Sequence, residues 1–145
     1  MQGELVEITH AQEFSASHRL HHPDLSPEEN RRLYGVCNNP NGHGHNYVVE
    51  VTVRGRVDPT GMVMDLNRLR DIVVEKLVRP VDHKHLNHDV PFLEGIVPTA
   101  ENVAIAFWRE IEPEIEAFRG CSLYRIRVCE SRSNRVDYMG PSRSP

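Results

Sequence analysis

The chain lacks several features that would place it in common classes of protein. No apolar run approaches the roughly 18 residues that a membrane-spanning helix needs. The cysteines are too few, and odd in number, for a disulfide framework; they are Cys37, Cys121 and Cys129. The segment from Met1 to Glu4 has neither the basic nor the apolar region of a secretion signal. We therefore expect a reducing, cytoplasmic setting and no membrane partner.

Charge of a single dominant sign is also lacking. The 17 Lys and Arg residues stand against 21 Asp and Glu residues, for a formal net charge of −4. Such a mixture argues against nucleic acid as the main partner, which requires a concentrated positive surface. We see no repeat and no internal linker, so we predict one domain over residues 1–139 and a disordered tail over 140–145. A small molecule is the expected partner.

Four segments alternate between apolar and polar residues, as strands with one buried face do. They run from Leu5 to Phe14 and over 45–54, 123–130 and 135–139. Within the third segment, the alternation places Tyr124, Ile126 and Val128 on one face. Glu130 ends that segment and is expected on the same face.

Two segments in the middle of the chain carry apolar residues at helical spacing. Asp65 is predicted to cap the first helix, which ends before Pro80; Thr99 opens the second, which Pro113 interrupts. The predicted order, ββααββ, is that of an α+β fold whose antiparallel four-stranded sheet carries both helices on one face. Because such a sheet leaves two edges unpaired, copies of the chain are expected to join edge to edge into a barrel.

The segment from Cys37 to Tyr47, with the sequence CNNPNGHGHNY, runs a thiol and two histidines into the second strand. If the alternation extends backward, His43 and His45 point the same way from one face, roughly 6.5 Å apart along the chain. His18 ends the first apolar segment and joins them if the two strands pair. Three histidines with one open position are typical of catalytic Zn²⁺. Without His18 and Cys37, the two histidines could equally be polar residues at a turn.

Four motifs, in this order, resemble the 6-pyruvoyl-tetrahydropterin synthase family. They are FSASH at 14–18, CNNPNGHGHNY at 37–47, DHK at 82–84 and T-x-E-N at 99–102, and the likeness extends from residue 4 to about 139. The resemblance implies the tunnelling fold (T-fold), with trimers that close a barrel, a homohexamer of two trimers, and active sites at subunit interfaces. It also implies a carbon-oxygen lyase of tetrahydrobiopterin biosynthesis, which converts 7,8-dihydroneopterin triphosphate into 6-pyruvoyl-tetrahydropterin and triphosphate.

That reaction removes carbon-bound protons next to the substrate's side-chain hydroxyls. Zn²⁺ on His18, His43 and His45 would act as a Lewis acid on these hydroxyls. The resemblance and the polar loop make Cys37 the expected base, with a thiol pKa lowered by a nearby cation. The alternatives for Cys37 are a fourth zinc ligand or a small buried hydrophobe.

In the family pattern, Asp82 and His83 form a proton relay with the cysteine, in which the carboxylate orients the imidazole. The spacing of these residues does not show this, because adjacent side chains need not face each other. Taken alone, His83, His85 and His88 are surface loop residues.

Glu130 would carry a carboxylate into apolar surroundings, so it requires a partner. A pterin offers a ring N–H and an amino group side by side, to which one carboxylate can bind, and the family uses a glutamate here as the pterin anchor. Thr99 and Glu101 have family counterparts near the pterin, although the same pair suits any helix start. Three cations are available for the triphosphate, and the sequence does not choose among them: Arg19, Lys84 and Arg132.

Two other functions remain open from the sequence. The first is 6-carboxytetrahydropterin synthase of queuosine biosynthesis, which uses the same substrate and zinc but usually has a shorter spacing between its cysteine and histidines. The second is a non-catalytic protein that binds zinc or pterin, in which Cys37 is a metal ligand.

Overall fold

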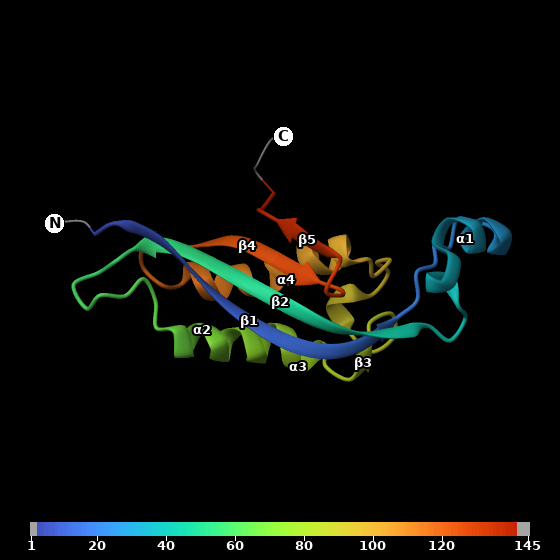
Figure 1. Ribbon diagram of the computed structural model, residues 1–145, viewed down its shortest axis with the longest axis horizontal. Helices are drawn as coiled ribbons and strands as arrows, with labels where there is room; N and C mark the ends of the chain where they lie inside the picture. The colour runs from blue at the N-terminus through green and yellow to red at the C-terminus, as the bar shows by residue number, and fades with distance from the viewer. Residues whose placement is uncertain (1–2, 142–145) are drawn as a thin grey trace.

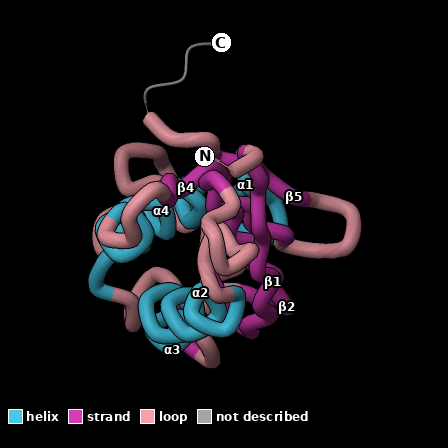
Figure 2. The backbone as a smooth tube through the Cα atoms, turned by 90° about the vertical axis from the view of Figure 1, so that its left-hand side faces the viewer, coloured by secondary structure: helices cyan, strands magenta, loops and turns pink. Residues whose placement is uncertain are grey.

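A twisted sheet forms one layer of the computed structural model, which describes residues 3–141, and helices cover one of its faces (Figures 1 and 2). The strand order is β3-β1-β2-β4-β5. The strands are β1 (Leu5–His18), β2 (His43–Arg56), β3 (Lys84–His85), β4 (Cys121–Cys129) and β5 (Arg135–Tyr138). The predicted α+β class is confirmed. The sheet has five strands rather than four, because β3 adds a short parallel pairing to the edge of β1 at Ala16 and Ser17.

The helical segments lie between β1 and β2 and between β2 and β4. They are α1 (Pro27–Tyr34), η1 (Gly35–Asn38), α2 (Leu66–Val73), η2 (Val74–Val78), α3 (Arg79–Val81), η3 (Pro91–Leu93) and α4 (Ala100–Glu116). Neither α1 nor η1 was predicted from the sequence. They belong to an arm, residues 19–42, that extends past the end of the sheet in Figure 1. Within residues 3–141, no helix combines the length and apolar character needed to cross a bilayer.

Two proline positions differ from the prediction. The first predicted helix does not end before Pro80, because the π-helical η2 widens the path and Pro80 sits in the first turn of α3, where its missing N–H costs little. Helix α4 runs through Pro113 without interruption. Ile111 and Ile115 are fully buried on either side of Pro113, so their packing outweighs one lost hydrogen bond near the helix end.

The core lies between the helices and the inner face of the sheet. Val49, Val51 and Val53 of β2 are fully buried there, as the alternation predicted. Phe14 of β1 stacks on Tyr47 at 4.8 Å between ring centroids and meets Phe107 of α4 edge to face. This packing holds the ends of β1 and β2 rigidly where they carry the candidate site.

A bulge in β4 turns Tyr124 away from the face predicted for it. The register with β2 shifts between Thr52 and Val53, so that Val53 pairs with Leu123 and Tyr124 leaves the ladder. Leu123 takes the core position, with 5% of its surface exposed. The guanidinium of Arg54 lies 4.0 Å from the Tyr124 ring centroid on the outer face. The expectation for Tyr124 was therefore wrong, whereas Ile126 and Val128 are fully buried.

The C-terminal part of the chain packs back on α4. The backbone of Gly140 approaches Trp108 so closely that an added Cβ would lie 2.8 Å from the indole ring. Of the tail predicted over 140–145, residues 142–145 lie outside the described part of the chain.

Candidate metal centre and active site

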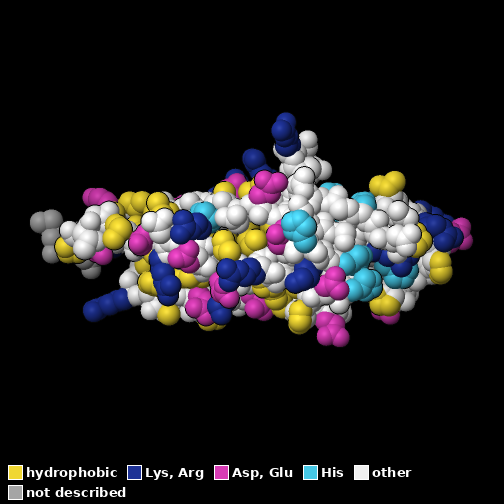
Figure 3. Space-filling model, turned by 90° about the horizontal axis from the view of Figure 1, so that it is seen from below, with side chains coloured by type: hydrophobic (Ala, Val, Ile, Leu, Met, Phe, Trp, Pro, Cys, Tyr) yellow, Lys and Arg dark blue, Asp and Glu magenta, His cyan; other side chains and the backbone are white. Residues whose placement is uncertain are grey.

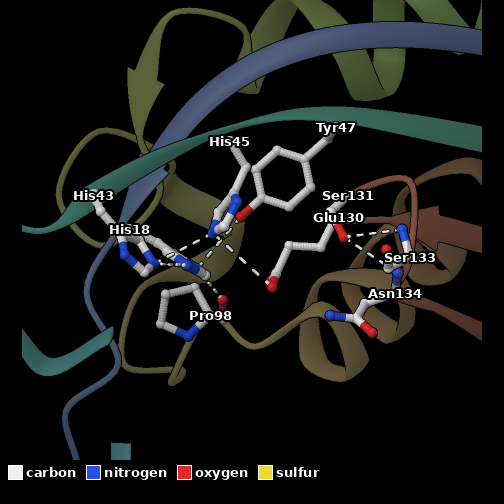
Figure 4. Close-up of polar contacts among 9 residues, drawn as sticks. All are labelled: His18, His43, His45, Tyr47, Pro98, Glu130, Ser131, Ser133 and Asn134. Carbon is white, nitrogen blue, oxygen red and sulfur yellow. Dashed lines mark hydrogen bonds and ion pairs between the residues drawn. The ribbon is translucent and has the colours of Figure 1, made fainter. Parts of the chain in front are cut away.

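Three histidines converge at one end of the sheet (Figure 4). The antiparallel pairing of β1 with β2 sets His18 opposite His43 and Ala16 opposite His45. All three side chains therefore emerge on the inner face. The Nε2 atom of His43 lies 3.1 Å from Nε2 of His18 and 3.2 Å from Nε2 of His45.

This group has the donor chemistry and spacing of a metal site. The ligand nitrogens of His18, His43 and His45 all lie within 4.8 Å of one another. Nitrogens bound tetrahedrally at ~2.0–2.1 Å from zinc are separated by about 3.3 Å. The two short separations match that value, so the three residues could hold a metal ion of the zinc type.

His18 is oriented for ligation by its surroundings. It is fully buried, and its Nδ1 lies 2.8 Å from the Pro98 carbonyl and 3.3 Å from the Tyr47 hydroxyl. An Nδ1–H donated to this carbonyl leaves the lone pair on Nε2, which faces the other two histidines. Burial lowers the pKa of His18 and of His45 and so favours the neutral form that binds metal. Sequence patterns gave no signal for the Pro98 carbonyl.

Glu130 points from the end of β4 towards these histidines (Figure 4). Its Oε1 lies 3.9 Å from His45 Nε2. Beside it is a cavity of about 260 Å³ that is also lined by Thr99 and Glu101. Thr99 caps α4 by accepting a hydrogen bond from the Asn102 N–H. The structure thus gathers the three residues expected to contact substrate at one cavity next to the metal group.

Cys37 lies outside the group of three histidines. It is half-buried in η1, and its carbonyl accepts a hydrogen bond from the Leu20 N–H at 2.8 Å. Burial and the carboxylate of Glu130 raise the pKa of the Cys37 thiol. The protein's own groups therefore act against the lowered pKa that a catalytic base requires.

Asp82 and His83 pair with each other, at 3.0 Å between Asp82 Oδ2 and His83 Nδ1. The positive φ of 60° at His83 turns two adjacent side chains together. Backbone contacts with β1 fix the pair, because Asp82 Oδ1 accepts from the Ser15 N–H and the His83 N–H donates to the Ser15 carbonyl. The bond from Ser15 lowers the pKa of Asp82. The His83 side chain is 81% exposed.

The Asp82–His83 dyad and Cys37 are not brought together within one chain. Among the described residues, no hydrogen bond, ion pair or electrostatic interaction joins them. His83 instead lines an open cavity of about 390 Å³ beside β3, together with Ser15 and Lys84. Space-filling Figure 3 shows histidines gathered towards the arm end of the molecule.

The cations proposed for a triphosphate lie in three different places. Arg19 donates from Nε to the Asn38 carbonyl at 3.1 Å. Lys84 lies at the edge cavity, and Arg132 lines a cavity of about 490 Å³ that Glu50 also lines. His85 stacks on His88 at 4.4 Å between ring centroids, apart from the group of three histidines.

A sheet with helices on one face and a histidine group at its end defines a T-fold protein with a candidate metal centre. The family model for 6-pyruvoyl tetrahydropterin synthase matches residues 7–141. The chain belongs to this family, as its motifs predicted.

Named relatives agree along nearly the whole chain. The chain is 51% identical to 6-pyruvoyl tetrahydrobiopterin synthase of Poecilia reticulata over 135 residues, covering 92% of this chain and 89% of the relative. It is 47% identical to that of Homo sapiens over 136 residues, covering 93% and 92%. The structure of Caenorhabditis elegans 6-pyruvoyl tetrahydropterin synthase is similar, with a TM-score of 0.89, 40% identity, and coverage of 97% and 99%. The relatives' names are those of pterin-synthesising enzymes, which supports an enzyme rather than a structural protein.

Proposed function

We propose that the protein is a zinc-dependent 6-pyruvoyl-tetrahydropterin synthase. It converts 7,8-dihydroneopterin triphosphate into 6-pyruvoyl-tetrahydropterin and triphosphate, as a carbon-oxygen lyase of tetrahydrobiopterin biosynthesis. The observation that carries this proposal is the convergence of three histidine nitrogens directly beside a cavity that holds two glutamates. Membership of the family supports it.

The cavity beside the histidines suits a pterin ring. The carboxylate of Glu130 or Glu101 can accept the ring N–H and the exocyclic amino group in a bidentate, charge-assisted contact. Because Glu130 lies close to His45, a ring bound by Glu130 directs its side chain towards the metal ligands. Thr99 closes the same cavity from the start of α4.

The chain provides a base near the same position. When bound, Zn²⁺ would supply Lewis-acid polarisation of the substrate's side-chain oxygens. Cys37 accepts a carbon-bound proton, for which it must be a thiolate. Burial and Glu130 both raise the pKa of the Cys37 thiol, whereas a cation close to it would lower that pKa and favour the thiolate.

The Asp82–His83 dyad would exchange protons with that thiol or with the substrate. Asp82 is held by Ser15 and orients the imidazole, while His83 stays exposed at the β1 edge of the sheet. A dyad that does not line the cavity of Glu130, Thr99 and Glu101 in its own chain fits an active site completed by a second copy. We therefore include a homohexamer in the proposal. The free state of all three cysteines is consistent with a cytoplasmic, reducing location.

The decisive experiment is incubation of the zinc-loaded protein with 7,8-dihydroneopterin triphosphate, followed by mass spectrometry of the products. We expect 6-pyruvoyl-tetrahydropterin and triphosphate, with Cys37→Ala protein as the control that loses turnover. A 6-carboxytetrahydropterin and a two-carbon fragment would replace this proposal with the carboxy synthase. Binding of pterin and zinc without any product would indicate the non-catalytic alternative.

A further inference from the structure

The chain just past the end of β1 is hydrogen-bonded to η1, which carries Cys37. The Leu20 N–H donates to the Cys37 carbonyl at 2.8 Å. A second hydrogen bond is made by a side chain, since Nδ2 of Asn38 donates to the Leu20 carbonyl at 2.7 Å. These two hydrogen bonds lie two residues after the candidate metal ligand His18.

Asn38 is tied to three consecutive residues of that segment. Besides its contact with Leu20, its Nδ2 lies 3.1 Å from Nδ1 of His21, and its carbonyl accepts from Arg19 Nε. Only 3% of Asn38 is exposed. A buried amide with both of its partners inside the protein is costly to disturb, since the carbonyl left behind loses its donor.

The thiol itself has no comparable anchor. Among the described residues, no hydrogen bond reaches the Cys37 sulfur, so its position depends on how its backbone is held. That backbone is tied to Leu20 by two contacts, the bond from the Leu20 N–H to the Cys37 carbonyl and the bond from the Asn38 side chain to the Leu20 carbonyl. Beyond them, the loop turns through a contact of the Gly42 N–H with the Asn39 carbonyl and then enters β2.

We propose that Asn38 is a positioning residue that fixes the Cys37 thiol relative to the metal ligand His18. The inference rests on the proposed role of Cys37 as the base. A proton acceptor displaced by about 1 Å can lose on the order of 100-fold in rate. Asn38 therefore acts on turnover through the thiol, with no contact to substrate or metal of its own.

Asn87 offers a matched control, because its amide holds the same segment from the other side. Its Oδ1 accepts from the Arg19 N–H and its Nδ2 donates to the Arg19 carbonyl, both at 2.8 Å. Asn38→Ala and Asn87→Ala each remove a side chain that makes two contacts with the 19–21 segment. Only Asn38 is the chain neighbour of Cys37, so only Asn38→Ala is expected to loosen the position of the thiol.

The experiment compares the two zinc-loaded variants with the unmodified protein. Iodoacetamide labelling of Cys37 is measured by peptide mapping across a pH series, with the half-buried Cys129 of the same molecule as the internal reference. For Asn38→Ala we expect a higher Cys37-to-Cys129 ratio at pH 7 and a lower midpoint of the Cys37 profile, because the thiol gains contact with water. We also expect kcat to fall at least about ten-fold, with KM and zinc content little changed. For Asn87→Ala, the labelling ratio should stay as in the unmodified protein.

An unchanged labelling ratio in Asn38→Ala, or an equal change in both variants, would overturn the inference. If Asn38→Ala does not fold, Asn38→Asp, which keeps the side-chain size but removes both N–H donors, takes its place with the same criteria. The labelling result does not depend on turnover. A changed ratio with no pyruvoyl product from the unmodified protein would contradict the proposed function, and with it the catalytic part of this inference.

Discussion

The metal group and the Asp82–His83 dyad both adjoin β1, which ends at His18 and hydrogen-bonds the dyad through Ser15, but they differ in how far one chain completes them. The histidine group is on the inner face, with His18 fully buried and its ring held by Pro98. The dyad lies at the outer edge, with His83 81% exposed. A buried group whose partners come from its own chain is complete in the monomer. An oriented but exposed pair fits the proposal that a second copy completes its site.

The largest effect should come from removing a ligand of the metal group, which one chain completes by itself. We expect His45→Ala to lose bound zinc and all measurable turnover, because two nitrogens cannot replace the three-histidine set. Bound metal is measured by elemental mass spectrometry after dialysis. His85→Ala is the matched control, since His85 lies outside the metal group and should keep one zinc per chain. A full zinc complement in His45→Ala would remove His45 from the ligand set.

A smaller but still severe loss is expected from Cys37→Ala. Removal of a positioned base should reduce turnover on the order of 100-fold or more. Zinc and pterin binding should remain, since Cys37 is not one of the three converging ligands. Zinc loss in this variant would favour the fourth-ligand role, whereas near-normal turnover would point to another base, with His83 the first to test.

Mixing two inactive variants tests whether the dyad serves a second copy. Cys37→Ala and His83→Ala subunits are unfolded, combined in equal amounts and refolded together. If each site takes its thiol and its dyad from different copies, about half of the sites receive an intact thiol and about half of those also receive an intact dyad. Roughly a quarter of the sites then become functional in a closed assembly. Each variant refolded alone is the control. Turnover no higher than in these controls would show that both groups serve the same chain's site.

The metal group could be predicted from the sequence more fully than the dyad. Alternation is local, so it placed His43 and His45 on the face of Val49, and strand pairing then brought His18 to them. The dyad depends on a left-handed residue at His83 and on contacts with Ser15, 67 positions away from Asp82. Neither has a periodic signal, and only the family resemblance grouped these residues with Cys37.

Other failures of prediction have similar causes. A bulge shifts a register by one residue, so Tyr124 turned outward although the pattern of apolar residues around it was sound. The two-residue β3 is too short to carry alternation, and α1 is so polar that only its capping box, made by Ser26 and Glu29, marks it. Tertiary packing retained Pro113 in a helix that local rules would interrupt.

A substitution at Glu130 tests whether the cavity beside the metal group binds the pterin ring. Glu130→Gln keeps the side-chain size but loses the charge, so a pterin analogue should bind with about 1.5–3 kcal/mol less free energy, or roughly ten-fold to a hundred-fold more weakly. Zinc content should be unchanged. Calorimetric titration measures the affinity, and Glu101→Gln is the matched variant at the same cavity. Unaltered affinity in Glu130→Gln together with weak binding in Glu101→Gln would transfer the anchor role to Glu101.

The smallest expected effect separates the two regions by pH. Burial lowers the pKa of His18 below its ordinary value of 6.5, so the unfolded chain takes up a proton below that pH while the folded chain resists it. Stability of the zinc-free protein should therefore fall as the pH drops from 7.5 to 5.5, by at most about 1.4 kcal/mol per pH unit from this residue. Asp82 acts in the same direction but in a lower window, because its lowered pKa gives stability that is lost only below its ordinary value of 3.8. Urea unfolding at constant protein concentration measures both. His18→Gln should flatten the slope over this range and Asp82→Asn should leave it unchanged, whereas equal slopes in all three proteins would show that His18 is not held neutral by burial.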